Sequence, residues 1–124
     1  SIVASSLGKE EQAYAFYLRT ARLDLDDYNG EVEEGLHITS MAGTWMSIVE
    51  GFTGMRIVDD QLSFRPRLPK AWDDLGFRIN FRGVILSVTI THTTIAFSTK
   101  LNDTILLTVD DVAHEIAGSS VLSI

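Results

Sequence analysis

The sequence predicts an α+β chain in which two helices precede a small antiparallel β-sandwich domain. Residues 6–52 carry apolar side chains at helical spacing. Residues 55–124 instead alternate apolar and polar side chains and are rich in Thr, Ile and Val. The change occurs near Gly54, so we expect one domain over 1–54 and a second over 55–124.

The first helix is expected to begin after Ser6, whose hydroxyl can accept a hydrogen bond from an unpaired backbone N–H group. It should end near Asp26 or Asp27, because Asn29-Gly30 favours a turn. One face of this helix is apolar, and its members are spaced three or four residues apart: Ala13, Phe16, Tyr17, Ala21 and Leu25.

A second helix is expected over residues 35–50, with apolar side chains around nearly its whole circumference. These side chains are Leu36, Ile38, Met41, Ala42, Trp45, Met46, Ile48 and Val49. A helix that is apolar all round is typical of a buried helix. Two helices of this size cannot bury each other completely, so the segment is expected to belong to a larger helical array.

Strands are predicted at residues 55–58, 61–65, 76–82, 84–92, 94–100, 104–109, 112–117 and 120–124. The turn dipeptides between them are Asp59-Asp60, Arg82-Gly83, Asn102-Asp103 and Gly118-Ser119. Pro66 and Pro69 should keep residues 66–74 out of a central strand. Several antiparallel strands joined by close turns are typical of a sandwich.

Composition excludes several classes of function. The 124 residues include no cysteine, which removes disulfides, thiolate metal sites and thiol nucleophiles. A net charge of −7 argues against a partner with a phosphate backbone, so no nucleic acid is expected. No apolar run approaches the roughly 20 residues of a membrane span, so no membrane partner is expected either.

His37 is the candidate functional residue, because it lies at the expected start of the apolar helix. Backbone N–H groups there favour an anion, and an imidazole could donate to one. A histidine that caps the helix or fills a packing gap is the alternative, which spacing alone favours. His92 and His114 lie in predicted strands and are expected to be surface or edge residues.

Other motifs give weak signals for chemistry. The acidic run around Asn29-Gly30 fails as a calcium loop, because Leu25 and Leu36 would occupy the first and last ligand positions. The adjacent carboxylates of Asp59-Asp60 and Asp73-Asp74 would point in different directions, which is unfavourable for acid–base catalysis. Tryptophan is used more often for core packing than for stacking on a sugar. Composition and spacing alone therefore predict no enzyme.

One series of motifs is much more specific. In chain order it reads Ala21-Arg22-Leu23-Asp24-Leu25-Asp26-Asp27-Tyr28-Asn29-Gly30, Glu34-Gly35-Leu36-His37-Ile38-Thr39-Ser40-Met41-Ala42-Gly43-Thr44-Trp45, Gly51-Phe52-Thr53-Gly54-Met55-Arg56, Leu62-Ser63-Phe64-Arg65-Pro66-Arg67-Leu68-Pro69, Trp72 and Phe77-Arg78-Ile79-Asn80-Phe81-Arg82-Gly83. The series resembles the carboxy-terminal end of the family 65 glycoside hydrolases, which include maltose, kojibiose, nigerose and trehalose phosphorylases and some hydrolases. The resemblance covers residues 5 to about 92. Beyond that point the chain matches only in its strand-like character.

The resemblance implies a fold and a function. Residues 1–54 would be the last helices of a catalytic (α/α)6 barrel, and residues 55–124 the carboxy-terminal β-sandwich domain. The longer protein would be an inverting glycoside phosphorylase in the cytoplasm, with an α-linked glucose disaccharide and inorganic phosphate as substrates and no cofactor or metal. The general acid would lie upstream of this chain, so no catalytic residue is expected here. His37 matches the family histidine that helps to bind the attacking phosphate.

Two alternatives stay open. The longer protein could be a family 65 hydrolase, in which water replaces phosphate, or the chain could be a free-standing carbohydrate-binding or structural β-domain. We also expect the chain to be inactive alone. Without its barrel neighbours it is expected to fold its helices over the β-domain or to self-associate through residues 36–49, because large apolar patches usually find partners.

Overall fold

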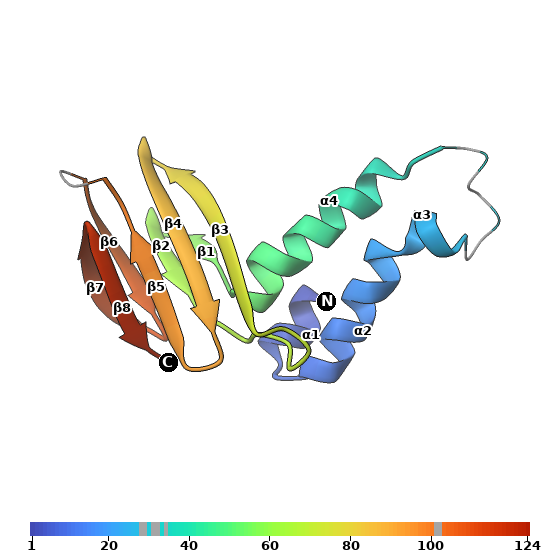
Figure 1. Cartoon of the computed structure of the whole chain (residues 1–124), viewed down its shortest axis with the longest axis horizontal. Coiled ribbons are helices and arrows are strands. Elements are labelled where there is room, and N and C mark those ends of the chain that lie inside the picture. Colours follow the sequence, from blue (N-terminus) through green and yellow to red (C-terminus); the bar gives the residue numbers. More distant parts are fainter. Residues whose placement is uncertain (28–29, 31–32, 34, 101–102) are drawn as a thin grey trace. The chain divides into compact units, whose positions relative to one another are not determined.

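A computed structural model describes residues 1–27, 30, 33, 35–100 and 103–124. The chain divides into two compact units, Ser1–Phe52 and Thr53–Ile124. The first unit is helical and the second consists of strands (Figure 1). This order of helices and sheets confirms the predicted α+β class.

The helical unit contains the following elements among its described residues: α1 (Ile2–Ser6), α2 (Glu10–Ala21), α3 (Leu23–Asp26), α4 (Ile38–Met46) and the π-helix η2 (Ser47–Phe52). The first helical segment ends at Asp26, as predicted. The turn predicted at Asn29-Gly30 includes Asn29, which lies outside the described residues. No helix of the described part of the chain is long and apolar enough to cross a membrane.

A break at Gly8 divides the predicted first helix. Gly8 has a φ of +70°, and its N–H group donates to the Ser5 carbonyl at 3.0 Å. The next N–H group, from Lys9, donates to the Ala4 carbonyl at 2.9 Å. This pair of bonds closes α1 with a left-handed glycine. The prediction that Ser6 caps the following helix was therefore wrong, since Ser6 is the last residue of α1.

The second predicted helix changes its winding after Met46, where α4 gives way to η2. Two serine hydroxyls donate to carbonyls in this region. The Ser47 hydroxyl bonds the Gly43 carbonyl at 2.8 Å, and the buried Ser5 hydroxyl bonds the Gly51 carbonyl at 2.7 Å. Side-chain donors that engage helix carbonyls accompany such local changes of winding. The Ser5 bond also attaches α1 to η2.

Close packing joins the helices of this unit. The α2 side chain of Thr20 would lie 3.5 Å from a Cβ atom built on Gly43, so glycine permits the close approach of α2 and α4. The rings of Tyr17 and Phe52 meet edge to face with centroids 5.4 Å apart. Ala13 and Phe52 are almost completely buried.

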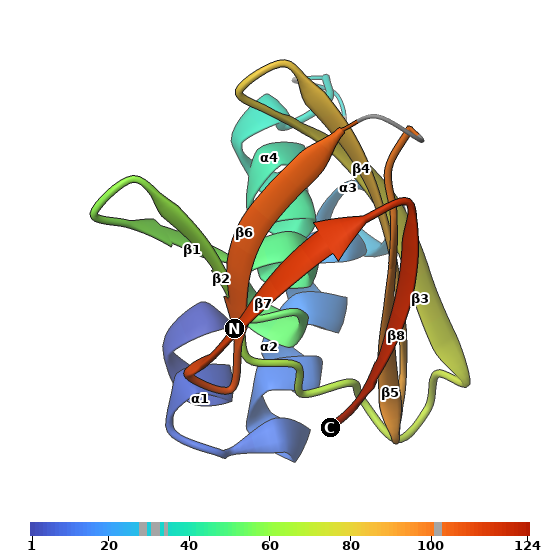
Figure 2. The same cartoon turned by 90° about the vertical axis from the view of Figure 1, so that its left-hand side faces the viewer.

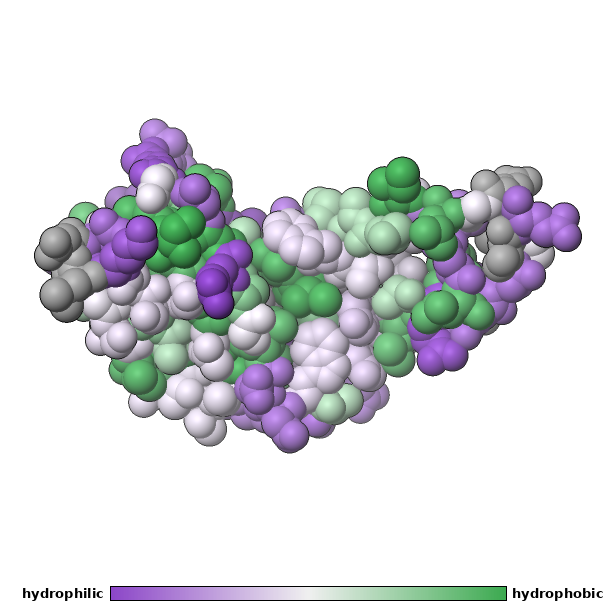
Figure 3. Space-filling model, turned by 45° about the horizontal axis from the view of Figure 1, so that its top comes forward, coloured by the Kyte–Doolittle hydropathy of each residue, from purple (hydrophilic) through white to green (hydrophobic). Residues whose placement is uncertain are grey.

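Large apolar side chains of the α4 segment nevertheless reach the surface. None of the α4 residues is buried. Leu36 and Ile38 are 73% and 78% exposed, and Met41 and Trp45 are each 56% exposed. Figure 3 shows apolar side chains on the surface of the helical unit. Self-association through residues 36–49 stays a prediction.

The second unit consists of two four-stranded sheets (Figure 2). Its strands are β1 (Arg56–Val58), β2 (Gln61–Phe64), β3 (Asp74–Phe81), β4 (Val84–Thr91), β5 (Thr94–Ser98), β6 (Thr104–Val109), β7 (Val112–Ala117) and β8 (Ser119–Ser123). One sheet has the order β1-β2-β6-β7 and the other β3-β4-β5-β8. Each of the eight predicted strands forms, with bounds within two residues of those predicted.

One strand pair departs from the antiparallel pattern. β2 and β6 are parallel, with Leu62 opposite Leu107 and Phe64 opposite Val109. The chain leaves the first sheet after β2, builds β3, β4 and β5 in the second sheet, and then returns through β6. A strand that returns by such a crossover can align with its neighbour in either direction, whereas a tight hairpin enforces the antiparallel one.

Two of the predicted hairpin turns use left-handed residue pairs. Asp59-Asp60 has φ values of 47° and 66°, and Arg82-Gly83 has values of 53° and 85°. Two consecutive positive φ angles twist a two-residue turn in the sense that flanking strands need. Asp110-Asp111 forms a third pair of this kind that was not predicted. Gly118 instead lies between β7 and β8, which belong to different sheets, and Asn102 lies outside the described residues.

The core of the β unit lies between its two sheets. Phe64 and Phe97 contact each other there, with ring centroids 5.3 Å apart. The buried cluster comprises Leu62, Phe64, Leu86, Val88, Ile90, Ile95, Phe97, Ile105, Leu107, Val109 and Ile116. Both sheets contribute to it, which is the arrangement of a sandwich.

A close backbone crossing occurs where the chain enters the β unit. Gly54 has a φ of +62°, and a Cβ atom built on it would lie 2.3 Å from the Arg65 carbonyl oxygen. The Arg65 N–H group donates to the Thr53 carbonyl at 3.1 Å, and Thr53 is fully buried. Arg65 begins the connection through Pro66 and Pro69. The connection reaches β3 at Asp74, and β3 is an edge strand, so residues 66–74 stay out of a central strand as predicted.

This crossing predicts that Gly54→Ala destabilises the β unit by more than about 2 kcal/mol, because the new methyl group meets backbone atoms in addition to a strained φ. Gly83→Ala is the matched control, since its φ is also positive but no atom lies within 4 Å of the new Cβ. That control should cost only about 1 kcal/mol. Urea unfolding measures the free energy of unfolding of both variants. Equal losses in the two variants would show that the close backbone crossing at Gly54 is not the cause.

Candidate functional site

His37 occupies the N-cap position of α4. Its backbone is extended, with φ −82° and ψ 90°, and its carbonyl accepts hydrogen bonds from Ser40 at 2.9 Å and Met41 at 3.2 Å. The N–H groups of Ile38 and Thr39 belong to this first turn. N–H groups at a helix start have no partner within the helix, and they favour negative charge.

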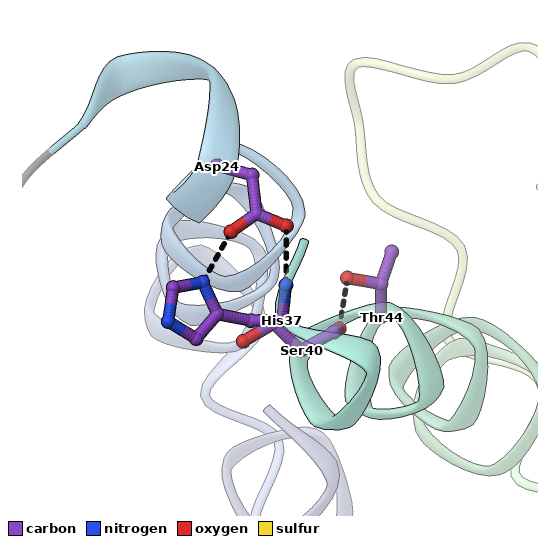
Figure 4. Close-up of polar contacts among 4 residues, drawn as sticks. All are labelled: Asp24, His37, Ser40 and Thr44. Atoms are coloured by element: carbon purple, nitrogen blue, oxygen red, sulfur yellow. Dashed lines mark hydrogen bonds and ion pairs between the residues drawn. The ribbon is translucent and has the colours of Figure 1, made fainter. Parts of the chain in front are cut away.

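The Asp24 carboxylate holds His37 at two points (Figure 4). One oxygen, Oδ2, accepts a hydrogen bond from the His37 backbone N–H group at 3.0 Å. The other, Oδ1, lies 2.5 Å from the ring nitrogen Nδ1. Asp24 comes from α3, thirteen residues before His37, so this contact joins the end of the first helical segment to the start of α4.

The protonation of this pair follows from the carboxylate. The side-chain hydrogen bond from His37 lowers the pKa of Asp24 below its ordinary value of 3.8, and the backbone hydrogen bond acts in the same direction. Asp24 is therefore ionised near neutral pH and can only accept hydrogen bonds. Nδ1 must then carry the proton that lies between the two groups. Both side chains are partly exposed, at 29% for His37 and 18% for Asp24.

Neighbouring contacts hold the first turns of α4. The Thr44 hydroxyl donates to the Ser40 carbonyl at 2.8 Å, one helical turn earlier (Figure 4). The close approach of α2 at Gly43 lies on the same helix. The His37 ring is thus attached to a helix that is itself packed against α2.

The other candidate residues do not join this site. The exposed His92 ring lies in the bend after β4, where Nε2 is 2.8 Å from the Trp72 carbonyl. His114 is half-buried in β7, which is an edge strand, as predicted. Asp59 and Asp60 form a hairpin turn. In the part of the chain that the structure describes, no group of three or more His, Asp or Glu side chains could hold a metal ion.

Sequence reasoning found His37 but missed Asp24 as its partner. Asp24 belongs to the acidic run around Asn29-Gly30, which was considered as a calcium loop and rejected. No spacing rule relates residues thirteen positions apart across a loop. Glu31 and Glu34 of the same run lie outside the described residues.

Two family models match the chain. "Glycosyl hydrolase family 65, C-terminal domain" matches residues 55–116, and "Glycosyl hydrolase family 65 central catalytic domain" matches residues 1–46. The chain belongs to glycosyl hydrolase family 65. The resemblance identified from the sequence is confirmed, and the family match extends beyond residue 92, where the specific motifs end.

The curated relatives of the chain include maltose, trehalose and kojibiose phosphorylases. The chain is 52% identical over 97 residues to a maltose phosphorylase of Bacillus subtilis and 45% identical over 98 residues to an alpha,alpha-trehalose phosphorylase of Thermoanaerobacter brockii. These matches cover 78% and 79% of this chain but only 13% of each relative. The chain therefore spans about an eighth of the length of these relatives.

A solved family 65 structure has the same fold. It is described as a putative kojibiose phosphorylase from the human microbiome, and its TM-score with this chain is 0.92 at 34% sequence identity. The match covers 99% of this chain and 18% of that one. The helices and sheets described above thus correspond to one part of a larger family 65 protein.

The Asp24–His37 contact predicts that His37→Ala raises the pKa of Asp24 toward 3.8, because the largest cause of its depression is removed. The depressed pKa stabilises the folded state above 3.8, and this contribution is lost as pH falls through the folded-state value. A carbon-13 NMR titration of the aspartate carboxyl groups measures the shift.

Asp111 is the internal control for this titration. Its hydrogen bond with Arg65 lowers its pKa, and His37→Ala leaves that pair intact. An Asp24 carboxyl that titrates at or above 3.8 while His37 is present would refute the assignment of the hydrogen bond.

Proposed function

We propose that this chain is the carboxy-terminal part of an inverting disaccharide phosphorylase, and that His37 binds the attacking phosphate. The observation that carries the proposal is the His37 ring, held by Asp24 at the start of α4 in a family 65 chain. The phosphorylase names of the curated relatives support the class of reaction.

The reaction uses an α-linked glucose disaccharide and inorganic phosphate. A phosphate oxygen attacks C1 of the glucosyl unit while the glycosidic bond between C1 and the leaving oxygen breaks. That oxygen takes a proton from a carboxylic acid on the opposite side of the sugar. The products are β-glucose 1-phosphate and the released sugar. The acid belongs to the remainder of the longer protein, so residues 1–124 alone are inactive.

His37 and the start of α4 supply what the attacking phosphate needs. The phosphate dianion must lose bound water and be held with one oxygen facing C1. Too much positive charge around it would lower the nucleophilicity of that oxygen. The partial positive charge at a helix N-terminus and one imidazole provide attraction at a fixed position. Both features occur at His37. Its carbonyl accepts the first bonds of α4, which places the residue at the helix N-terminus, and its side chain is the imidazole.

The exposed face of α4 is consistent with this assignment. Leu36, Ile38, Met41 and Trp45 would be covered by the other helices of an (α/α)6 barrel, which complete the site around His37. The longer protein would work in the cytoplasm, where inorganic phosphate is available as a substrate.

We predict that the full-length protein releases β-glucose 1-phosphate from one of maltose, kojibiose, nigerose or trehalose only when phosphate is present. Enzymatic assay of β-glucose 1-phosphate and free glucose, with and without phosphate, tests this. Equal yields of the two products are expected. Release of glucose at the same rate without phosphate would identify a hydrolase instead and would overturn the proposal.

His37→Asn should lower kcat/KM for phosphate in the full-length protein by about ten- to a hundredfold, which corresponds to the loss of one charged hydrogen bond. Asparagine is a favourable N-cap residue, so α4 keeps its start while the distal ring nitrogen is lost. His92→Asn, in the bend after β4, is the control and should leave kcat/KM unchanged. An equal and small effect of both substitutions on phosphate kinetics would refute the role of His37.

A further inference from the structure

Asp24 makes one contact more than capping of a helix would require. One carboxylate oxygen binds the backbone N–H group of His37, and the other binds the ring of the same residue. We propose that Asp24 is the positioning residue of the phosphate site and that its carboxylate sets both the orientation and the tautomer of the His37 ring. This inference rests on the phosphorylase function proposed above.

The two-point contact fixes the ring relative to the backbone. Without Asp24 the His37 ring could rotate about two side-chain bonds, whereas bonds of 3.0 Å to the backbone nitrogen and 2.5 Å to Nδ1 allow one arrangement. Figure 4 shows that the second ring nitrogen, Nε2, lies on the side of the ring away from Asp24. An anion that approaches the ring from that side therefore meets Nε2.

The charge of Asp24 fixes which nitrogen carries the proton. An ionised carboxylate accepts hydrogen bonds, so Nδ1–H donates to Oδ1 and is committed to that bond. Nε2 can donate to phosphate only when the ring carries a second proton and a positive charge. A carboxylate within hydrogen-bond distance stabilises that charge. Asp24 thus favours the form of His37 that attracts an anion.

A merely structural role makes a different prediction. If Asp24 only attached α3 to α4, removal of its charge would weaken folding and would affect both substrates alike. The bond to the backbone N–H group fits that role, but the bond to Nδ1 contributes an interaction with the reactive part of the side chain. The two roles are separable, because positioning of the ring acts on phosphate and not on the disaccharide.

α3 offers a matched control. Asp26 lies two residues from Asp24 in the same short helix, and its carboxylate binds Arg22 through two bonds of 2.7 Å each. Asp26→Asn removes one negative charge from the same element without removing the His37 contact. Asp24→Asn keeps the size of the side chain, and Asp24→Glu keeps its charge.

The test measures KM and kcat for phosphate and for the disaccharide in the full-length protein, with these three variants and His37→Asn. We expect Asp24→Asn to raise KM for phosphate about tenfold or more while KM for the disaccharide changes less than twofold. Asp24→Glu should recover part of the phosphate affinity, because charge is retained. Asp26→Asn should resemble the unmodified protein for both substrates.

The outcomes separate the two proposals. A weak effect of His37→Asn on phosphate kinetics overturns the proposed function itself. A strong effect of His37→Asn together with unchanged phosphate KM in Asp24→Asn overturns only the positioning role. Equal effects of Asp24→Asn and Asp26→Asn on both substrates also overturn it, in favour of a structural role. If Asp24→Asn fails to fold, Asp24→Glu is compared with His37→Asn. A higher phosphate affinity in Asp24→Glu than in His37→Asn supports the positioning role, and equal affinities of the two variants refute it.

Discussion

The double hydrogen bond between Asp24 and His37 is the constraint on which the helical unit depends. It closes the connection between α3 and α4, two helices separated by eleven residues of chain. It also lies at the start of α4, since the residue that Asp24 holds is the one whose carbonyl accepts the first bonds of that helix. The same pair of hydrogen bonds therefore contacts both the start of α4 and the ring of the candidate site.

The two units bury their apolar side chains to different extents. The β unit encloses a continuous core between its sheets, to which Phe64 and Phe97 contribute from opposite layers. The helical unit buries Ala13 and Phe52 but leaves every residue of α4 at least partly exposed. A chain that spans about an eighth of its family 65 relatives is expected to contain such an unequal pair. The two sheets of the sandwich enclose its core between them, whereas the described helices leave the large apolar side chains of α4 at the surface.

Much of this fold could be predicted from sequence because its signals are local. Alternation located each strand within two residues, and Asp59-Asp60 and Arg82-Gly83 act as turns because left-handed backbone favours Asp and Gly. The break at Gly8 was missed, although a glycine three residues into a helical pattern was its visible signal. The parallel pairing of β2 and β6 and the partnership of Asp24 with His37 depend on contacts between distant residues. No periodicity or spacing encodes such contacts, so only the structure reveals them.

The most direct measurement is a crystal structure of the full-length protein with inorganic phosphate bound. We expect a phosphate oxygen within about 3 Å of His37 Nε2, close to the first N–H groups of α4, with Nδ1 still bonded to Asp24. Phosphate bound elsewhere in the catalytic site, with no oxygen within hydrogen-bond distance of the His37 ring, would contradict the role of His37 in phosphate binding.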